Sequence, residues 1–314
     1  MGGKKHVADE KKADGMITAL LTYLLWGILP IYWKLIVEVP AHEILAHRIF
    51  WSFVFMAILV FLTKKTSQVV KQIRQIFNSS KKFLSVAAGA ILICVNWFIY
   101  IWAVNNNRII ETSLGYYINP LVSMLIGIII LQERLSFWQA GSVIIAAFGV
   151  MNMALQFGDV PWVALILALV SGFYGLCKKI AALSPVTSMT LETMLTAPFA
   201  FIYLVYLQAA GSNTILNPVT AGLLTGTGIV TVVPLLLFAY SANELSLTVL
   251  GLFQYLMPTV GLLIGVFLYQ ESFTSVHFIS FVFIWSGLII FSLSKTKVFI
   301  QLEMLVIKIA TRKQ

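Results

Sequence analysis

The sequence predicts an all-α membrane protein of ten transmembrane helices, arranged as two inverted repeats of five helices each. Three observations support this fold class: the composition, the lengths of the apolar segments and an internal duplication. Sixty per cent of the 314 residues are hydrophobic and 11 per cent are charged, and the mean hydropathy is +0.93. Such values are typical of a protein that crosses a bilayer several times rather than of a soluble core.

Ten apolar segments each approach the ~20 residues that a helix needs to cross ~30 Å of hydrocarbon. Because lipid offers no hydrogen-bond partner to an exposed backbone, each segment is expected to be helical. The predicted spans are 16–37, 44–63, 83–104, 112–131, 136–156, 161–182, 188–208, 219–241, 247–268 and 274–293.

The basic residues orient these spans. With a cytoplasmic N-terminus, 18 of the 21 Lys and Arg residues fall on the cytoplasmic side, one (Arg108) falls outside, and Lys34 and Arg48 lie within spans. This asymmetry predicts a multi-pass protein of the cell membrane with both termini in the cytoplasm. The charged leader runs into an apolar segment longer than that of a cleavable signal peptide.

One apolar segment occurs twice. Residues 114–136, LGYYINPLVSMLIGIIILQERLS, and residues 252–274, LFQYLMPTVGLLIGVFLYQESFT, are identical at nine of 23 positions at a constant offset of 138. Chance likeness between apolar segments explains matched leucines, but it does not place Pro, Gly and Gln-Glu in register. We therefore infer an internal duplication.

A second offset extends the duplication to the first span of each half. At an offset of 145, Gly27 aligns with Gly172, Lys34 with Lys179 and Pro40 with Pro185. Each half then holds five spans, and since five is odd, the halves cross the membrane in opposite senses. The predicted division is a cytoplasmic leader (1–15), a first repeat (16–156), a second repeat (161–293) and a basic, amphipathic cytoplasmic tail (294–314).

Several classes of function are disfavoured. The net charge is +9, but the basic residues lie in short loops between apolar spans, so no nucleic-acid partner is expected. Cys94 and Cys177 both lie within spans, and the four histidines are scattered without ligand spacing, so we expect no disulfide, metal site or cofactor. The same scatter argues against an enzyme. No Walker A sequence is present, so ATP is not expected to drive the protein directly.

The motif P-x6-G-x5-E closes spans four and nine, at residues 120–133 and 258–271. With ten spans in two inverted repeats of five, and this motif in each repeat, the sequence resembles the EamA family of the drug/metabolite transporter superfamily. Within that family, several strings are similar to RarD proteins: WGILPIYWKLI (26–36), EILAHRIFWS (43–52), NWFIYIWAVNN (96–106), SLGYYINPL (113–121) and FYGLCKK (173–179). The resemblance covers residues 16–294. It implies a ten-helix basket whose central cavity is lined by spans one to four and six to nine, with spans five and ten behind them.

Polar residues inside spans are the candidate site, because each costs free energy in lipid unless it faces protein or water. Lys34 and Arg48 lie near the outer ends of spans one and two, and we predict that they form a cationic, substrate-binding pair for an anionic group. The alternative is that they snorkel, or pair with Glu38 and Glu43 respectively. His47 is a candidate proton carrier, with a hydrogen-bonded structural role as its alternative.

A second set of substrate-binding candidates forms polar stripes on the spans. Asn96 and Tyr100 share one face of span three. Tyr116 and Asn119 share a face of span four, and Gln254 and Tyr255 lie in the duplicated segment of span nine. Hydrogen bonding between helices explains any one of these residues alone, whereas several converging on spans four and nine favour a cavity.

The remaining candidates concern gating and coupling. Pro120 and Pro258 each remove a hydrogen bond about a third of the way into their spans, which predicts a pair of hinges. Lys179 and Glu192, near the inner ends of spans six and seven, are predicted to be a mutual ion pair or a proton-coupling acid with its partner. Glu133 and Glu271, at the ends of spans four and nine, are interpreted as helix-end anchors.

These features predict a secondary transporter that exports small organic metabolites or drugs by alternating access, with anionic or carboxylate-bearing substrates favoured. Its expected partners are a small-molecule substrate, the lipid bilayer and a coupled proton or other ion. The alternative is an importer or permease of amino-acid-like metabolites. A membrane-embedded enzyme or a channel is less favoured, because neither requires an inverted duplication.

Overall fold

The computed structural model describes residues 2–131, 137–157, 161–211, 217–245 and 253–294, together with residues 296, 299 and 301. Within these residues the regular secondary structure is helical throughout. The helices are α1 (Gly2–Gly27), α2 (Leu29–Lys34), α3 (Ala41–Leu62), α4 (Thr66–Phe77), α5 (Ser80–Asn105), α6 (Ile109–Leu131), α7 (Phe137–Phe157), α8 (Trp162–Ala181), α9 (Pro185–Ala209), α10 (Pro218–Glu244), α12 (Leu256–Leu263), the π-helix η2 (Ile264–Leu268) and α13 (Ser275–Leu293).

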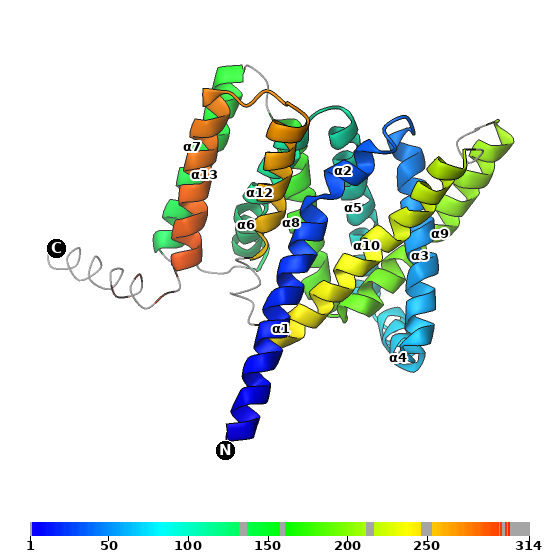
Figure 1. Cartoon of the computed structure of the whole chain (residues 1–314). Helices are drawn as coiled ribbons and strands as arrows, with labels where there is room; N and C mark the ends of the chain where they lie inside the picture. The colour runs from blue at the N-terminus through cyan, green and yellow to red at the C-terminus, as the bar shows by residue number, and fades with distance from the viewer. Residues whose placement is uncertain are drawn as a thin grey trace, which may run out of the picture.

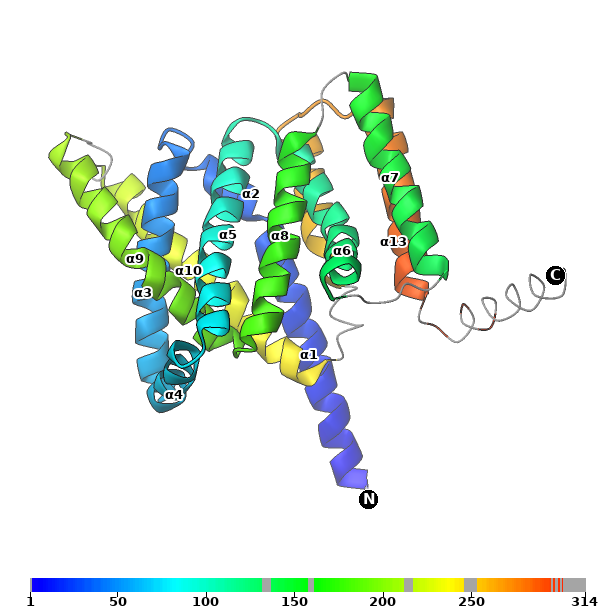
Figure 2. The same ribbon diagram turned by 180° about the vertical axis from the view of Figure 1, so that it is seen from behind.

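The long helices run back and forth between two ends of the molecule (Figures 1 and 2). One end carries α4, the N-terminal turns of α1 and the end of α13, and we call it the α4 end. The opposite end carries α2 and the turn between α5 and α6, and we call it the α2 end. Helices α7 and α13 lie side by side at one edge of the bundle in both views, and α7 packs directly on α13.

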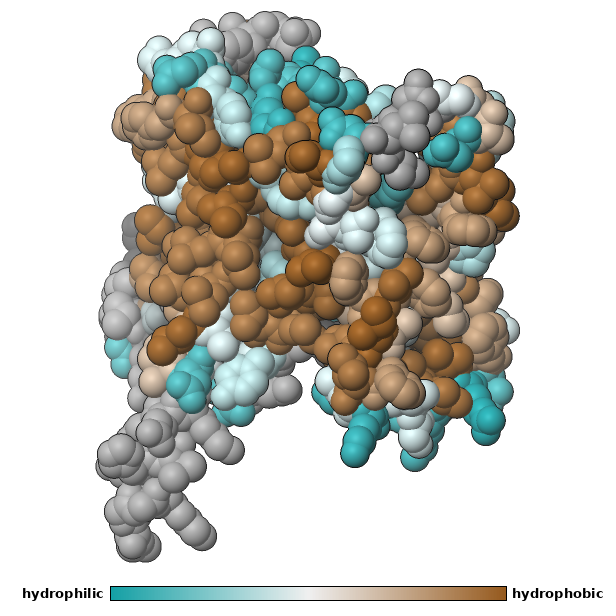
Figure 3. All heavy atoms as spheres, turned by 45° about the vertical axis from the view of Figure 1, so that its right-hand side comes forward, coloured by the Kyte–Doolittle hydropathy of each residue, from teal (hydrophilic) through white to brown (hydrophobic). Residues whose placement is uncertain are grey.

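The helices are long and apolar enough for a bilayer. Six stretches of the described residues meet the length and composition required of a membrane span: Ala13–Lys34, Ala41–Leu62, Ser80–Asn105, Trp162–Ala181, Val186–Ala209 and Pro218–Phe238. Three shorter apolar helices accompany them, namely Phe137–Met153, Leu256–Leu268 and Ser275–Phe291. On the face shown in Figure 3, hydrophobic side chains form a broad band across the middle, with polar side chains toward both ends. The chain is therefore a multi-pass membrane protein.

The first predicted span differs from the structure at both ends. Helix α1 begins at Gly2, so it extends through the segment that we predicted to be a leader. The lysines, alanines and glutamate of that segment have high helix propensity, which explains the extension. The helix then ends at Gly27, and the short helix α2 carries Pro30 in its first turn. Pro lacks the backbone N–H that a continuous helix would need at this point.

The ninth span also departs from the prediction of one kinked helix. Residues Gln254 and Tyr255 form a turn, and α12 begins only at Leu256. Pro258 consequently lies in the first turn of α12, where a backbone N–H has no intrahelical acceptor anyway. We expected Pro258 to remove a hydrogen bond within the helix. Because no residue at this position of α12 would make that bond, Pro258 removes none. Helix α6, in contrast, passes through position 120 without interruption.

The 64–82 loop, between the second and third predicted spans, contains an amphipathic helix, α4. Val69 and Ile76 face the protein, whereas Lys71 and Arg74 lie on its opposite, polar side. Such a helix suits the boundary between lipid and water. The amphipathic tail predicted at 294–314 lies mostly outside the described residues. Gln132 and Glu133 also lie outside them.

Glycines set the spacing between α7 and α13. A Cβ atom on Gly149 would lie 2.7 Å from the Ser280 carbonyl oxygen, and one on Gly287 would lie 2.7 Å from the Ser142 carbonyl oxygen. Ser142 and Ser280 are both fully buried. Gly149 and Gly287, like Ser142 and Ser280, are 138 residues apart in the chain. The same offset that joins the duplicated spans therefore describes a reciprocal contact between two helices.

We expect the glycines at this contact to be intolerant of any side chain. Gly287→Ala should destabilise the protein by about 1–3 kcal/mol, because the new methyl group must push α7 and α13 apart. Gly141→Ala is the matched control on α7, since nothing lies within 4 Å of its Cβ position. Relief of the glycine's backbone entropy should make that variant up to about 1 kcal/mol more stable. Equal unfolding temperatures for the two variants in detergent would contradict the interpretation.

Helix contacts recur in matched pairs across the molecule. The contact between α6 and α8 is matched by the contact between α12 and α1. In the same way, the contact between α5 and α8 is matched by that between α10 and α1, and the contact between α3 and α10 by that between α9 and α5. Three further contacts, α3 with α9, α6 with α12 and α7 with α13, join helices at the same position of each predicted half. Exchange of the two halves thus leaves this set of contacts unchanged.

Candidate functional site

Arg48 is the most deeply buried cation among the described residues. It lies two turns into α3 and is 5 % exposed. Its guanidinium carbon is 4.1 Å from the centre of the Trp97 ring and 5.0 Å from that of Trp33. Its Nε donates a hydrogen bond of 3.0 Å to Thr231 Oγ1 on α10. Three elements besides α3 therefore hold one side chain: α2, α5 and α10.

Burial of this cation is costly unless the charge is compensated. Each desolvated cation–π contact stabilises it by about 2 kcal/mol, and the bond to Thr231 satisfies one donor. Among the described residues, the contacts of Arg48 include no carboxylate, and Glu271 and Glu192 each have other partners. Aromatic faces and hydroxyl groups thus stabilise a charge that they do not neutralise.

A layer of polar side chains borders Arg48. Tyr100 and Tyr116 lie close enough to interact with its charge. Their rings meet edge to face at 5.8 Å. Tyr116 donates to Asn96 Oδ1 at 3.3 Å, and Asn96 Nδ2 donates to Ser171 Oγ at 3.0 Å. The predicted stripes on spans three and four therefore converge, as Asn96, Tyr100 and Tyr116, around Arg48.

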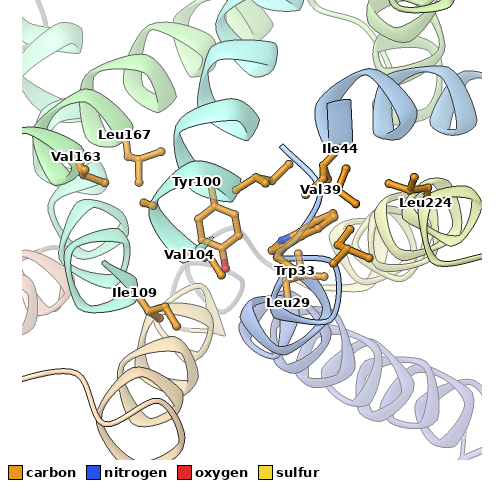
Figure 4. Close-up of a cluster of buried hydrophobic side chains, with 13 residues drawn as sticks. Leu29, Trp33, Val39, Ile44, Tyr100, Val104, Ile109, Val163, Leu167 and Leu224 are labelled. Atoms are coloured by element: carbon orange, nitrogen blue, oxygen red, sulfur yellow. The ribbon is translucent and has the colours of Figure 1, made fainter. Parts of the chain in front are cut away.

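This region contains an excess of unpaired hydrogen-bond donors. Within the described part of the chain, no partner is found for the buried atoms Trp33 Nε1, Arg48 Nη1, Ser52 Oγ and both ring nitrogens of His47. Ser52 lies one turn beyond Arg48 on the same face of α3. Trp33 and Tyr100 belong to the hydrophobic cluster of the α2 end (Figure 4). Buried donors without acceptors are uncommon in native proteins. Trp33 Nε1 and Arg48 Nη1 can only donate, so only a hydrogen-bond acceptor could satisfy them.

Lys34 does not share the partners of Arg48. Its Nζ donates to Asn107 Oδ1 at 2.6 Å and lies 5.2 Å from the centre of the Tyr269 ring. The side chain thus points toward the turn after α5, at the α2 end. The predicted Lys34–Arg48 pocket is consequently divided into two environments, because Arg48 turns into the bundle and Lys34 turns toward the surface.

A second buried polar cluster lies toward the α4 end, around Glu192 of α9. Glu192 is 2 % exposed. Its Oε1 lies 2.7 Å from Lys178 Nζ and accepts from Ser188 Oγ at 3.0 Å, while its Oε2 accepts from Tyr174 Oη at 2.9 Å. The cation paired with Glu192 is therefore Lys178, and not Lys179 as we predicted. Helical periodicity explains the difference, because Lys178 lies one turn from Tyr174 on the same face of α8.

Cys94 on α5 lies between the two clusters. Its thiol forms a hydrogen bond with Thr196, and it lies close enough to Arg48 and Glu192 to interact with both charges. The structure thus connects the two buried clusters through one side chain.

The remaining substrate-binding candidates lie on α6 or directly before α12. Tyr255 stacks on Tyr117 at 6.5 Å between ring centres. Both border a largely apolar cavity of about 510 Å³ between α6, α12 and α13, together with Thr259 and Trp285. Gln254 occupies the turn before α12, and Asn119 is half-buried on α6.

Glu271 is a helix-end anchor, as predicted. Its two carboxylate oxygens accept from the backbone N–H groups of Ile109 and Ile110, at 2.8 and 2.9 Å. An anion at a helix N-terminus satisfies free donors and complements the helix dipole. The span-nine end is thereby tied to the start of α6. Its duplicate, Glu133, lies outside the described residues.

The sequence did not single out several residues that complete these clusters. Thr231 lies within a long apolar helix and gives no signal of its own. Trp33 and Trp97 are indistinguishable in sequence from membrane-belt aromatic residues. Lys178 is adjacent to the duplicated Lys179, which drew attention away from it. Within the described residues no cluster of three or more His, Cys, Asp or Glu side chains could hold a metal ion.

The fold is that of a multi-pass helical membrane protein, and it encloses the cation Arg48 without a carboxylate partner among the described residues. Comparison with known proteins agrees. The model of the EamA-like transporter family matches the chain twice, over residues 13–155 and 160–293. This chain belongs to that family.

Curated relatives are similar over most of their length. The uncharacterized transporter YojE of Bacillus subtilis is 44 % identical over 293 residues, covering 92 % of this chain and 96 % of that protein. Protein RarD of Escherichia coli is 43 % identical over 280 residues, covering 88 % of this chain and 93 % of that protein. A solved crystal structure with 16 % identity matches with a TM-score of 0.57 over 93 % of this chain and 99 % of that chain. It supports the fold alone.

Proposed function

We propose that the protein exports small organic anions by alternating access between two inverted repeats, with Arg48 as the group that binds the anion. The observation that carries this proposal is the pair of buried donors, Arg48 Nη1 and Trp33 Nε1, that lack an acceptor among the described residues. A carboxylate, phosphate or sulfonate has only acceptors and would satisfy both kinds of donor at once.

The surroundings favour a planar or aromatic anion. Trp33 and Trp97 already stack on the guanidinium, and Tyr100 and Tyr116 stand beside them. Such walls bind an apolar body, while the guanidinium and Asn96 bind a polar head. Because an arginine fork holds two acceptor oxygens in one plane, it also fixes the orientation of the head group.

The matched helix contacts support the inverted-repeat arrangement. In the contact between α7 and α13, Gly149 meets Ser280 and Gly287 meets Ser142. A two-fold axis in the membrane plane would produce such a reciprocal contact. Arg48 lies seven residues after the first residue of α3, and Glu192 lies seven residues after the first residue of α9. Under this symmetry the two groups lie at opposite depths, which suits a path that opens alternately to each side.

The membrane potential supports export as the direction. With both termini in the cytoplasm, as the distribution of basic residues favours, the α4 end faces inward. A negative interior then drives an anion outward with about 2.3 kcal/mol per charge for every 100 mV. No coupled ion is needed for a net anion.

Transport of radiolabelled benzenesulfonate by the full-length protein in proteoliposomes tests this proposal. This ion stays charged at every working pH, and benzenesulfonamide is its neutral counterpart of nearly equal shape. We expect saturable net uptake of the sulfonate that increases when the vesicle lumen is made positive, together with transport of the sulfonamide at least tenfold slower. Equal rates for the two compounds, or rates equal to those of protein-free vesicles, would overturn it.

A further inference from the structure

We propose that Lys178 is a second anion-binding group at the α4 end of the same path, held by Glu192 until an anion arrives. The inference rests on the proposed function, and it names the point at which an anion entering from the cytoplasmic side is first bound. It concerns a cluster of α8 and α9 that is connected to the Arg48 site through Cys94.

The first argument is the geometry of the ion pair. The Glu192 side chain is 3 % exposed, whereas that of Lys178 is 31 % exposed. The acid is thus enclosed, and the cation reaches the surface. Glu192 also keeps two hydroxyl partners, Ser188 and Tyr174, one on each oxygen. Lys178 can therefore turn toward an incoming anion while the carboxylate retains a hydrogen bond on both oxygens.

The second argument is the way in which the pair joins two helices. Helices α8 and α9 are consecutive, but neither packs extensively on the other. Helix α8 packs mainly on α6 and α5, and α9 packs mainly on α3 and also contacts α5. The bonds from Lys178 and Tyr174 to Glu192 run between α8 and α9 beside Gly89 of α5, where Glu192 Oε1 is 3.7 Å from the glycine's Cβ position. An anion that takes Lys178 from Glu192 weakens this link, so it favours the state in which α8 and α9 separate.

The third argument is the duplication. At the offset of 145, Lys178 corresponds to Trp33 and Glu192 corresponds to His47. Trp33 stacks on Arg48, the next residue after His47. Each half thus builds a buried polar cluster from its first and second spans, at the same position on the first span and at neighbouring positions on the second. If the halves are inverted, these clusters mark the two ends of one path.

The charged and titratable groups that face Glu192 in the described structure are Lys178, Tyr174 and Cys177 of α8 and Cys94 of α5. The two cysteines are useful reporters, because Cys177 is adjacent to Lys178 and Cys94 lies near both clusters. Neither has a disulfide partner. The single-cysteine protein Cys94→Ser therefore reports the Lys178 cluster through Cys177. The single-cysteine protein Cys177→Ser reports through Cys94, which lies near both clusters.

The test is protection of these thiols from N-ethylmaleimide by benzenesulfonate, with benzenesulfonamide as control, in the full-length protein in nanodiscs at one fixed pH. We expect the sulfonate to slow alkylation of Cys177 at least threefold, and Lys178→Gln to remove this protection. Lys178→Arg should preserve it, because the charge remains. Arg48→Gln should remove protection of Cys94 but leave that of Cys177.

Each outcome decides between the proposals. Two results would overturn the second site: protection of Cys177 that persists in Lys178→Gln, or no protection of Cys177 in the protein with Lys178 intact. Neither result would contradict the proposed role of Arg48. Protection of Cys177 without protection of Cys94 would support Lys178 and count against Arg48. If Lys178→Gln does not fold, Lys178→Arg still provides the decision, since loss of protection with charge retained would mean that the lysine is structural.

Discussion

Arg48→Gln is expected to abolish anion transport while leaving the protein at least as stable as before. Removing the charge that binds the anion should lower kcat/KM for benzenesulfonate about 100-fold or more, since a charged hydrogen bond to a buried group contributes about 2–4 kcal/mol. Removing a buried, uncompensated cation should stabilise the fold or leave it unchanged. The opposite signs distinguish a binding residue from a structural one.

Arg48→Lys refines this expectation. The charge remains, but the bond from Nε to Thr231 and the planar stack between Trp33 and Trp97 are lost, so we expect about a tenfold loss of kcat/KM. Lys34→Gln is the matched control, because Lys34 donates to Asn107 near the surface. It should change kcat/KM less than threefold. Transport assays and unfolding temperatures measured on the same preparations provide both readouts. Normal transport with lost stability in the Arg48 variants would show that the arginine is structural.

The largest expected loss of stability comes from Lys178→Met. Glu192 would then keep its charge in a site where its side chain is 3 % exposed, and breaking a buried ion pair in this way costs about 3–5 kcal/mol. Glu192→Met should cost less, because the Lys178 side chain is 31 % exposed and its ammonium can reach water.

The double variant Lys178→Met/Glu192→Met completes the comparison. Its loss should be smaller than that of Lys178→Met alone, because neither residue then leaves an unpaired charge in the interior. Unfolding by sodium dodecyl sulfate, followed by tryptophan fluorescence, gives the four stabilities. Losses that simply add in the double variant would show that the two side chains do not interact, and would remove the basis for the second site.

The sequence by itself determined the class of this protein. Apolar segments of ~20 residues leave the backbone no choice but a helix in lipid, so the long spans agree with the helices of the structure. The duplicated segments likewise led to the family that the comparisons found. Helical spacing also assigned Asn96 and Tyr100 to one face of span three, and Tyr116 to a face of span four, before the helices are packed. That these two faces meet was not predicted, because the sequence analysis expected the polar residues to converge on spans four and nine.

Only the tertiary structure decided which polar groups meet. Arg48 and Lys34 are equally isolated cations in the sequence, yet one is enclosed by tryptophans from α2 and α5 and the other turns to Asn107. Lys178 and Lys179 differ by one position, which is a rotation of about 100° around a helix. That rotation, rather than residue type, selected Lys178 as the partner of Glu192. Local pattern assigns a residue to a helix, whereas the relative rotation and crossing of helices far apart in the chain determine its neighbours.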